Sequence, residues 1–339
     1  MLVGLIDVDN YNKLDECFPN IPLMKLSTWH KNNGDGVEWH NLNKHYDRVY
    51  MSKVFSFSPD YPFCIDADEI RKGGSGYAIR LENGKEIFDE TKNNELPYEV
   101  EHSFPDYGLY GITDTAYGFM SRGCPRGCDF CHVKRKEGLR SRKVADLHEF
   151  WNGQKNIEIL DPNTLACKEW KDILQQLIDS KAWVDFNQGV DIRLMTEEKA
   201  EMLRKVKIKH IHFAYDRYQD KKYIEPKFEL LKERTGWGRS KVSVYVLTNF
   251  DTTLEQDLDR IYFLRNLGGA DKGFQPYVMR YNKEHIPRGS AVNQLARWVN
   301  FKPLFWKYKT FEEYLERNNG WEGQITIDEW LNRKGELEK

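Results

Sequence analysis

The feature that most constrains the fold is an alternation of short apolar runs and amphipathic segments along the middle of the chain. Six runs have the composition of buried strands, and they cover residues 115–120, 156–161, 184–194, 209–215, 242–250 and 274–282. The segment after the fifth run begins with a capping box at Thr252–Thr253 and ends at Gly268–Gly269, as a helix does. Successive parallel strands need a crossover connection, which is right-handed. The sequence therefore predicts an α/β fold in which six strand–helix units form a partial (β/α)6 parallel barrel.

Three of the six cysteines lie close together in a chain of 339 residues. Cys124, Cys128 and Cys131 are separated by three residues and then by two, and Gly123 and Gly127 supply a permissive backbone between them. So short a spacing is unsuited to a disulfide framework and is typical of metal ligands. The loop therefore predicts a metal centre.

Two kinds of centre fit three cysteines. A zinc ion could be held by the three thiolates and His132, but structural zinc sites usually add a second ligand pair well down the chain, and this sequence has none. An iron–sulfur cluster held by three thiolates leaves one iron without a protein ligand, and that position can bind a substrate or cofactor. We favour the cluster, and a zinc-stabilised binding module without catalysis is the alternative.

The segment Cys124-Pro-Arg-Gly-Cys128-Asp-Phe-Cys131 resembles the Cys-x3-Cys-x2-Cys loop of the radical S-adenosylmethionine (SAM) superfamily, and the resemblance includes the aromatic Phe130. It extends over residues 107–300. It implies that the three cysteines are the catalytic ligands of a [4Fe-4S] cluster, whose open iron chelates SAM. The reduced cluster of such enzymes cleaves SAM to a 5'-deoxyadenosyl radical, which abstracts hydrogen from a substrate. Phe130 is expected to present backbone groups to the adenine.

Polar residues at the ends of the expected strands are candidate ligands, because ligands gather at the carboxyl ends of barrel strands. Those assigned to SAM, besides Phe130, are Asp161, Asn163, Gln188, Asp191, Arg193 and Tyr215. Asp161-Pro-Asn163 stands where the family usually has Gly-Gly-Glu, and Asp191 and Arg193 have the structural alternative of pairing with each other. The residues assigned to the substrate are Trp29, Asp216, Tyr281 and Asn282. His210 and His212 alternate along one strand, where we expect buried, hydrogen-bonded side chains rather than ligands.

Residues 1–106 have a different pattern, which indicates a small Rossmann-like lobe with strands at residues 2–9 and 22–28. The lobe resembles the cobalamin-binding domain that precedes the barrel in one radical SAM subgroup. Cobalamin proteins of that subgroup often contain Asp-x-His-x-x-Gly, but no aspartate stands two residues before His30. We therefore expect a degenerate lobe without cobalamin. Residues 301–339 are aromatic with helical spacing and form a C-terminal helical extension.

The charge and the hydropathy of the chain limit the kinds of molecule that it is expected to bind. The chain has 51 Lys and Arg against 53 Asp and Glu, which gives no general attraction to a polyanion, so nucleic acid is an unfavoured partner. It has neither a basic leader nor the run of roughly 20 apolar residues that spans a membrane. We expect a cytoplasmic enzyme with no membrane partner, a small-molecule substrate and a flavodoxin- or ferredoxin-type electron donor.

The size of the chain and its shortened N-terminal lobe resemble those of the queuine lyases of the radical SAM superfamily. That resemblance implies cleavage of a carbon–nitrogen bond of queuine, a 7-deazaguanine base, to release its aminomethyl deazaguanine precursor. Radical modification of a tRNA or a peptide is the alternative within the same superfamily, and it would require binding of the macromolecule with a steep salt dependence.

Overall fold

The computed structural model describes residues 1–12, 18–82, 85–92 and 94–317. These residues form two compact units, Met1–Val184 and Asp185–Lys339, and the boundary falls inside one strand, β11 (Trp183–Val190). The boundary predicted after residue 106 lies within the first unit, and residues 318–339 of the predicted C-terminal extension lie outside the described residues. No helix among the described residues is long and apolar enough to cross a membrane.

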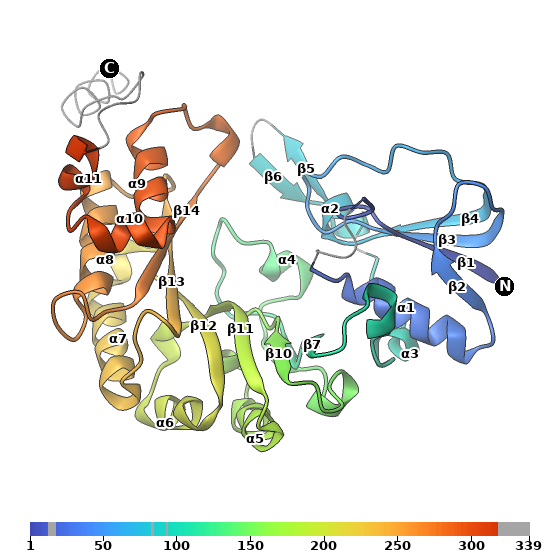
Figure 1. Cartoon of the computed structure of the whole chain (residues 1–339), viewed down its shortest axis with the longest axis horizontal. Helices are drawn as coiled ribbons and strands as arrows, with labels where there is room; N and C mark the ends of the chain where they lie inside the picture. The colour runs from blue at the N-terminus through green and yellow to red at the C-terminus, as the bar shows by residue number, and fades with distance from the viewer. Residues whose placement is uncertain (13–17, 83–84, 93, 318–339) are drawn as a thin grey trace. The chain divides into compact units, whose positions relative to one another are not determined.

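The first unit begins with a four-stranded parallel sheet (Figure 1). Its strands lie in the order β2 (Gly36–Trp39), β1 (Leu2–Asp7), β3 (Tyr46–Ser52) and β4 (Ala67–Gly73). Successive side chains of a strand point to opposite faces, and both faces of β1 are buried. Val3 and Leu5 join one core cluster with Leu23 and Leu26, and Ile6 joins a second cluster. A parallel sheet with an inner strand buried on both faces is the arrangement expected of a Rossmann-like lobe.

One element of this lobe differs from the prediction. Residues 22–28, expected as a strand, belong to helix α1 (Ile21–Asn32). The side chain of Asn20 accepts a hydrogen bond from the backbone N–H of Leu23, and Pro22 occupies the first turn, where its missing N–H costs nothing. The buried positions Leu23, Leu26 and His30 have helical spacing. This spacing and the cap outweigh the apolar composition that suggested a strand.

The rest of the first unit contains short elements around the cysteine loop. They are α2 (Ser75–Ala78), β5 (Ile79–Glu82), β6 (Lys85–Phe88), α3 (Tyr98–Glu101), β7 (Thr115–Gly118), β8 (Ser121–Arg122), α4 (Val133–Lys136), β9 (Arg142–Lys143), β10 (Asn156–Ile159) and α5 (Trp170–Ser180). Strand β10 pairs in parallel with β7, whereas β8 and β9 form an antiparallel pair. The cysteines therefore follow β7 and precede β10, as the sequence predicts.

The second unit repeats a strand and a helix. After β11 come α6 (Glu197–Lys205), β12 (Ile208–Ala214), α7 (Lys221–Thr235), β13 (Val242–Thr248), α8 (Leu254–Asn266), β14 (Gln275–Arg280), α9 (Ala291–Asn300), α10 (Lys302–Lys307) and α11 (Phe311–Arg317). The strands lie in the order β11-β12-β13-β14, and the pairs β12/β13 and β13/β14 are parallel. All six predicted strands are thus present and the α/β class is confirmed, while the closure of six units into a barrel stays a prediction.

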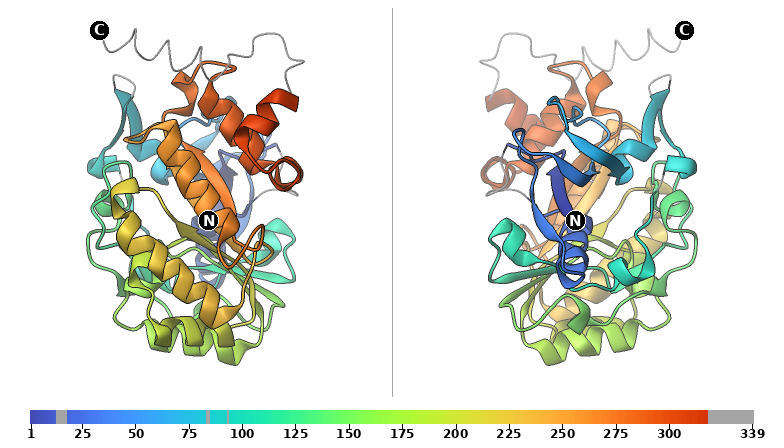
Figure 2. Two further views of the ribbon diagram at one scale, coloured as in Figure 1. Left: turned by 90° about the vertical axis from the view of Figure 1, so that its left-hand side faces the viewer. Right: turned by 90° about the vertical axis from the view of Figure 1, so that its right-hand side faces the viewer.

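The two faces of these strands differ in chemistry. Helices α6 to α8 lie along one face, and α7 and α8 are visible side by side in the left view of Figure 2. Ile211 and Phe213 of β12 are buried, and Phe213 contacts Phe228 of α7. His210 and His212 alternate with them and therefore lie on the face away from these helices. This second face is polar and partly exposed.

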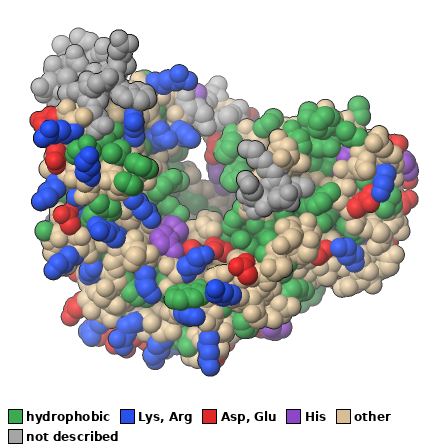
Figure 3. Space-filling view, viewed as in Figure 1, with side chains coloured by type: hydrophobic (Ala, Val, Ile, Leu, Met, Phe, Trp, Pro, Cys, Tyr) green, Lys and Arg blue, Asp and Glu red, His purple; other side chains and the backbone are tan. Residues whose placement is uncertain are grey.

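Helix α9 packs with α10 and α11 around Trp298, which is fully buried and contacts the rings of Phe305 and Phe311. Aromatic packing thus forms the described part of the predicted C-terminal extension. On the face seen in Figure 3, lysine and arginine side chains are numerous over the left-hand and lower part, with scattered acidic side chains among them.

Candidate functional site

The cysteine loop is closed at its base by the β8/β9 pair, in which Ser121 is opposite Lys143 and Arg122 is opposite Arg142. Gly123 opens the loop with a positive φ of 85°, and a Cβ at this position would lie 2.3 Å from the carbonyl oxygen of Arg140. Only glycine combines this backbone conformation with so close an approach. The loop therefore begins at a turn that a side chain would break.

A carboxylate fixes the start of the loop. Glu137 accepts hydrogen bonds from the backbone N–H of Gly123 at 3.0 Å and from the guanidinium of Arg122 at 3.3 Å. Arg122 also pairs with Glu101 and lies 3.9 Å above the ring of Phe119. Because these contacts tie the residue before the loop to the residues after the cysteines, they hold the two ends of the loop together.

The three cysteines are partly exposed thiols. Cys124 donates its backbone N–H to Gly138, and Cys131 donates to the carbonyl oxygen of Cys128, which makes a tight turn between the second and third thiols. In the part of the chain that the structure describes, Asp185, His210 and His212 form a group whose ligand atoms all lie within 4.8 Å of one another. The three sulfur atoms do not form such a group.

This spacing bears on the choice between zinc and a cluster. Sulfur ligands of one tetrahedral zinc ion lie about 3.8 Å apart, since each is about 2.3 Å from the metal. In a [4Fe-4S] cluster each thiolate binds a different iron, so the sulfur atoms are farther apart. The donor set, three thiolates without a second ligand pair, fits a cluster better than a single zinc ion.

Asn163 reaches this loop from the segment that follows β10. It is 1% exposed, and its side-chain amide donates a hydrogen bond to Sγ of Cys124 at 3.4 Å. Its Oδ1 is buried without a hydrogen-bond partner in the protein, while its backbone oxygen accepts from Ser141 at 3.4 Å. A donor on a thiolate ligand tunes the metal that the thiolate binds. The structure thus brings one residue predicted to contact SAM to a predicted cluster ligand.

Asp161 lies at the exit of β10 and is nearly inaccessible to solvent. Its carboxylate accepts hydrogen bonds from the backbone N–H of Met120 at 2.7 Å and from the hydroxyls of Ser121 and Thr164 at 2.6 and 3.1 Å. Burial raises the pKa of Asp161 to about 6, and the hydrogen bonds oppose that shift. These hydrogen bonds join Asp161 to Met120 and Ser121, which precede the cysteine loop, and to Thr164, which follows β10. Asp161 therefore holds the start of the cysteine loop against the end of β10.

A cavity of about 400 Å³ lies beside the stem of the loop. Its lining is rich in charged side chains of both signs and comprises Arg140, Ser141, Arg142, Lys143, Val144, Ala145, Asp146, Glu149, Lys168 and Glu169. Lys143 forms ion pairs with Asp146 and Asp172. At least one of the basic residues after the cysteines is therefore paired with carboxylates of the protein, as a structural role for it requires.

In the second unit, Asp191 and Arg193 contact each other. Nε of Arg193 donates to Asp191 at 2.8 Å, the backbone N–H of Arg193 donates to the same carboxylate at 3.1 Å, and Nη1 donates to Asp220 at 2.8 Å. This is the structural alternative stated for the pair, in which the aspartate caps the following turn. The guanidinium of Arg193 therefore has two carboxylate partners in the protein, and its assignment to SAM stays a prediction.

Tyr215 and Asp216 follow β12, but they have different environments. Tyr215 is fully buried, its hydroxyl donates to Glu225 at 3.2 Å, and burial raises its pKa. Its backbone N–H donates to Tyr245 and its carbonyl accepts from Arg260. All its polar groups have protein partners, which counts against the predicted contact with SAM. Asp216 is partly exposed, and burial raises the pKa of its carboxyl to about 6.

The remaining predicted residues lie on other elements. Gln188 is exposed near the end of β11, and Tyr281 follows β14 with its ring 4.8 Å from that of Phe250. Asn282 has a positive φ of 50°, a conformation that asparagine tolerates better than most residues. Trp29, predicted to contact substrate, is in α1 and packs against the buried core cluster of the N-terminal lobe. It has a packing role in that lobe.

Sequence analysis missed three residues of the loop environment, namely Ser121, Glu101 and Glu137. It also missed Asp185, which lies beside His210 and His212. Glu137 follows the last cysteine closely in the sequence. A carboxylate at that place could have been predicted to close the metal-binding loop. No local pattern marks Asp185, because its neighbours come from another strand.

The fold is similar to that of a solved radical SAM enzyme. The chain aligns with a radical SAM methyltransferase, TsrM, from Kitasatospora setae, whose structure contains cobalamin and a [4Fe-4S] cluster. The two chains are 11% identical, the TM-score is 0.54, and the alignment covers 82% of this chain and 74% of TsrM. No family model matches the sequence, and no curated protein sequence matches it. The likeness is one of fold, and it agrees with the predicted α/β class.

Proposed function

We propose that this protein is a radical SAM enzyme, which reductively cleaves SAM at a [4Fe-4S] cluster held by Cys124, Cys128 and Cys131 and abstracts hydrogen from a small-molecule substrate. The observation that supports it most is the three-thiol loop with the Asn163 amide on Cys124, in a chain whose fold is similar to that of a radical SAM methyltransferase.

When bound, the cluster would supply an electron for cleavage of SAM and an open iron for chelating it. The chain's own residues have separate tasks. Cys124, Cys128 and Cys131 provide three thiolates, which leave one iron open. The amide of Asn163 steadies the sulfur of Cys124, and Asp161 holds the backbone at Met120 through a hydrogen bond of 2.7 Å. Because the thiols are partly exposed, SAM and an electron donor of the flavodoxin or ferredoxin type can reach the site.

The finer form of the proposal is a queuine lyase that breaks a carbon–nitrogen bond of a 7-deazaguanine base. Its support is the size of the chain and the short N-terminal lobe. Asp216 adds a chemical argument: with a pKa of about 6, its carboxyl can accept or donate a hydrogen bond near neutral pH, and the edge of a purine-like base has both donors and acceptors. A cytoplasmic location is part of the same proposal.

The proposal includes no cobalamin, although TsrM contains it. His30 is the histidine considered above as a cobalt ligand. It is fully buried, its Nδ1 contacts Asp35 at 2.6 Å and its Nε2 contacts Tyr50 at 3.1 Å, so both ring nitrogens have partners. Incubation of the protein with hydroxocobalamin, followed by gel filtration, should leave the protein fraction without cobalamin absorbance. Co-elution of one equivalent would contradict this part of the proposal.

The test of the main proposal starts with anaerobic purification and analysis of iron and acid-labile sulfide. Reduction with dithionite in the presence of SAM should then produce 5'-deoxyadenosine. Addition of queuine should increase that yield and release the aminomethyl deazaguanine if the lyase assignment holds, and an unchanged yield would refute the lyase form alone. A colourless, zinc-containing protein that makes no 5'-deoxyadenosine would overturn the whole proposal in favour of the binding module.

A further inference from the structure

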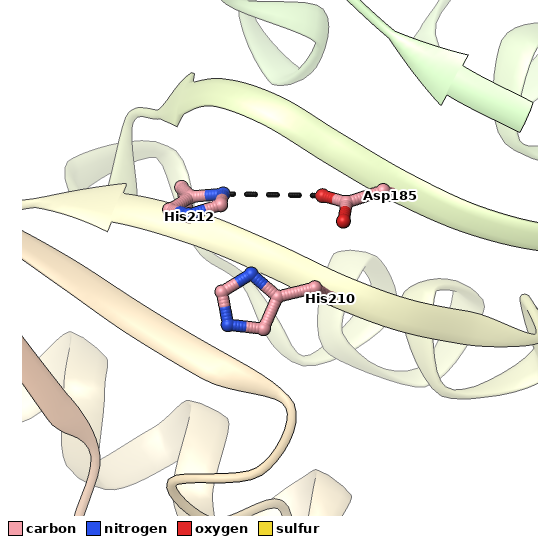
Figure 4. A group of neighbouring side chains, drawn as sticks. All are labelled: Asp185, His210 and His212. Carbon is pink, nitrogen blue, oxygen red and sulfur yellow. Dashed lines mark ion pairs between the residues drawn. The ribbon is translucent and has the colours of Figure 1, made fainter. Parts of the chain in front are cut away.

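The polar face of the second unit contains a group of side chains with the composition of a metal site. Asp185 of β11 and His210 and His212 of β12 each present one ligand atom, and the three atoms lie within 4.8 Å of one another. Figure 4 shows these side chains pointing toward one another from two neighbouring strands. The group is separate in sequence from the cysteine loop and has no part in the function proposed above.

Neighbouring groups orient both imidazole rings. Nε2 of His210 lies 3.1 Å from the hydroxyl of Ser243, and Nδ1 of His212 lies 3.1 Å from the carbonyl oxygen of Phe186. The ring of His212 is also stacked on Tyr245, with centroids 5.0 Å apart and planes 9° apart. In metal sites such partners fix the tautomer and the orientation of the ring. Each ring thus has one nitrogen, Nδ1 of His210 and Nε2 of His212, outside these hydrogen bonds, and Nδ1 of His212 is also the atom that lies 3.9 Å from Oδ1 of Asp185.

The carboxylate of Asp185 has an oxygen atom without a hydrogen-bond partner in the protein. Its Oδ1 is buried and has no hydrogen-bond partner in the protein, and it lies 3.9 Å from Nδ1 of His212, which is too far for a hydrogen bond. A buried carboxylate oxygen left without a partner is energetically unfavourable, because the cost of removing it from water is not repaid. A bound cation would satisfy it.

We propose that Asp185, His210 and His212 bind a divalent first-row transition metal ion. Imidazole ligands select Zn²⁺, Fe²⁺, Co²⁺ or Ni²⁺ over Mg²⁺ and Ca²⁺, which prefer oxygen ligands. Two histidines and one carboxylate leave coordination positions open, so the ion can also bind water or a substrate group. The alternative is that the two histidines are buried side chains satisfied by their hydrogen bonds alone.

The test uses the full-length chain with Cys124, Cys128 and Cys131 replaced by alanine, so that thiolates cannot bind the probe. Co²⁺ is titrated in and followed by visible absorption and by calorimetry. We expect one equivalent to bind, with d–d bands and without thiolate charge-transfer absorption. In the same background, Asp185→Asn, His210→Gln and His212→Gln should each weaken binding by about tenfold or more.

The matched control is His45→Gln. His45 also lies between two carboxylates, Asp66 at 2.8 Å and Asp68 at 3.3 Å, but all three side chains are exposed. We expect this replacement to leave the affinity unchanged. Absence of stoichiometric binding, or equal affinity in the parent and the three site variants, would overturn the proposal.

Far-ultraviolet circular dichroism shows whether each variant folds. Should a site variant unfold, nitrogen-15 NMR of the histidine rings in the parent, with and without Zn²⁺, gives the answer directly. Large shifts of a ring nitrogen in both His210 and His212 support the site, and rings that do not respond to Zn²⁺ refute it.

Discussion

The cysteine loop and the group of Asp185, His210 and His212 each contain three potential metal ligands, but the chain holds them in opposite ways. The thiols follow one another on a partly exposed loop, whose ends are held by Glu137 and by the β8/β9 pair. The histidines and the aspartate come from two strands, and hydrogen bonds orient each imidazole. Ligand atoms of the second group already lie within 4.8 Å of one another, whereas the three thiols do not.

This difference indicates that the geometry of the two groups of ligands depends to a different degree on the bound metal. The shape of a loop tied down at its ends depends on the group that fills it, because binding and local folding are coupled. A group on paired strands has its geometry set by the sheet before any ion arrives. Loss of the bound group should therefore affect the loop strongly and the strand group little.

The largest effect is expected from Cys128→Ala. The variant should lose its cluster, and 5'-deoxyadenosine formation should fall to background, while Co²⁺ binding at Asp185, His210 and His212 persists. Iron analysis and chromatography measure the first two, and calorimetry measures the third. Cys64→Ala, which removes an exposed cysteine outside the loop, is the control and should retain iron and turnover. Retained SAM cleavage in Cys128→Ala would refute the assignment of the loop.

The next effect concerns the stability of the second unit. Arg260 is fully buried, donates to the carbonyl oxygens of Tyr215 and Leu247 at 2.6 and 2.8 Å, and pairs with the buried Asp257. Arg260→Met should reduce the free energy of unfolding by about 3–5 kcal/mol, because it leaves a buried charge without its partner. Urea denaturation measures this change.

The matched control for Arg260 is Arg234→Met. Arg234 pairs with Glu197 at 2.7 Å, but the two side chains are 37% and 64% exposed, so the cost should be about 1 kcal/mol or less. Equal losses in the two variants would show that burial of Arg260 contributes nothing. Iron content of the cysteine loop should be unchanged in both variants.

A smaller effect depends on pH. Burial raises the pKa of Asp161 to about 6 from an unfolded value near 3.8, so the folded state binds this proton more tightly than the unfolded state. The resulting stability is fully present below about pH 4 and is lost as the pH rises through 6, with a difference of roughly 3 kcal/mol. Asp161→Asn removes this dependence. Unfolding free energies of both proteins between pH 4 and 7 should diverge by that amount, and parallel curves would contradict the shift.

The smallest effect is expected from Asn163→Ala. The variant should keep its iron but lose the hydrogen bond to Sγ of Cys124, which should slow SAM cleavage by about tenfold and lower the reduction potential. Asn156→Ala, at the partly exposed start of β10, is the control and should cleave SAM at the normal rate. An unchanged potential in Asn163→Ala would return the amide to a purely structural role.

The contrast between the two regions also explains what the sequence could predict. The cysteine loop is visible in the sequence because its ligands are adjacent along the chain, and the six strands are visible because their apolar runs are long. The face to which Asp185 points depends on how β11 aligns with β12, which no local pattern encodes. The same limit applies to Tyr215 and Arg193, whose positions at strand ends were predicted but whose side-chain partners depend on neighbouring helices and turns.

The central claim is that the three cysteines hold a cluster whose fourth iron is open to SAM. Electron paramagnetic resonance of the dithionite-reduced protein, recorded with and without SAM, tests it most directly. The account predicts the signal of a reduced [4Fe-4S] cluster whose g-values change when SAM is added, because SAM coordinates the open iron. A cluster signal that SAM leaves unchanged, or no cluster signal at all, would contradict it.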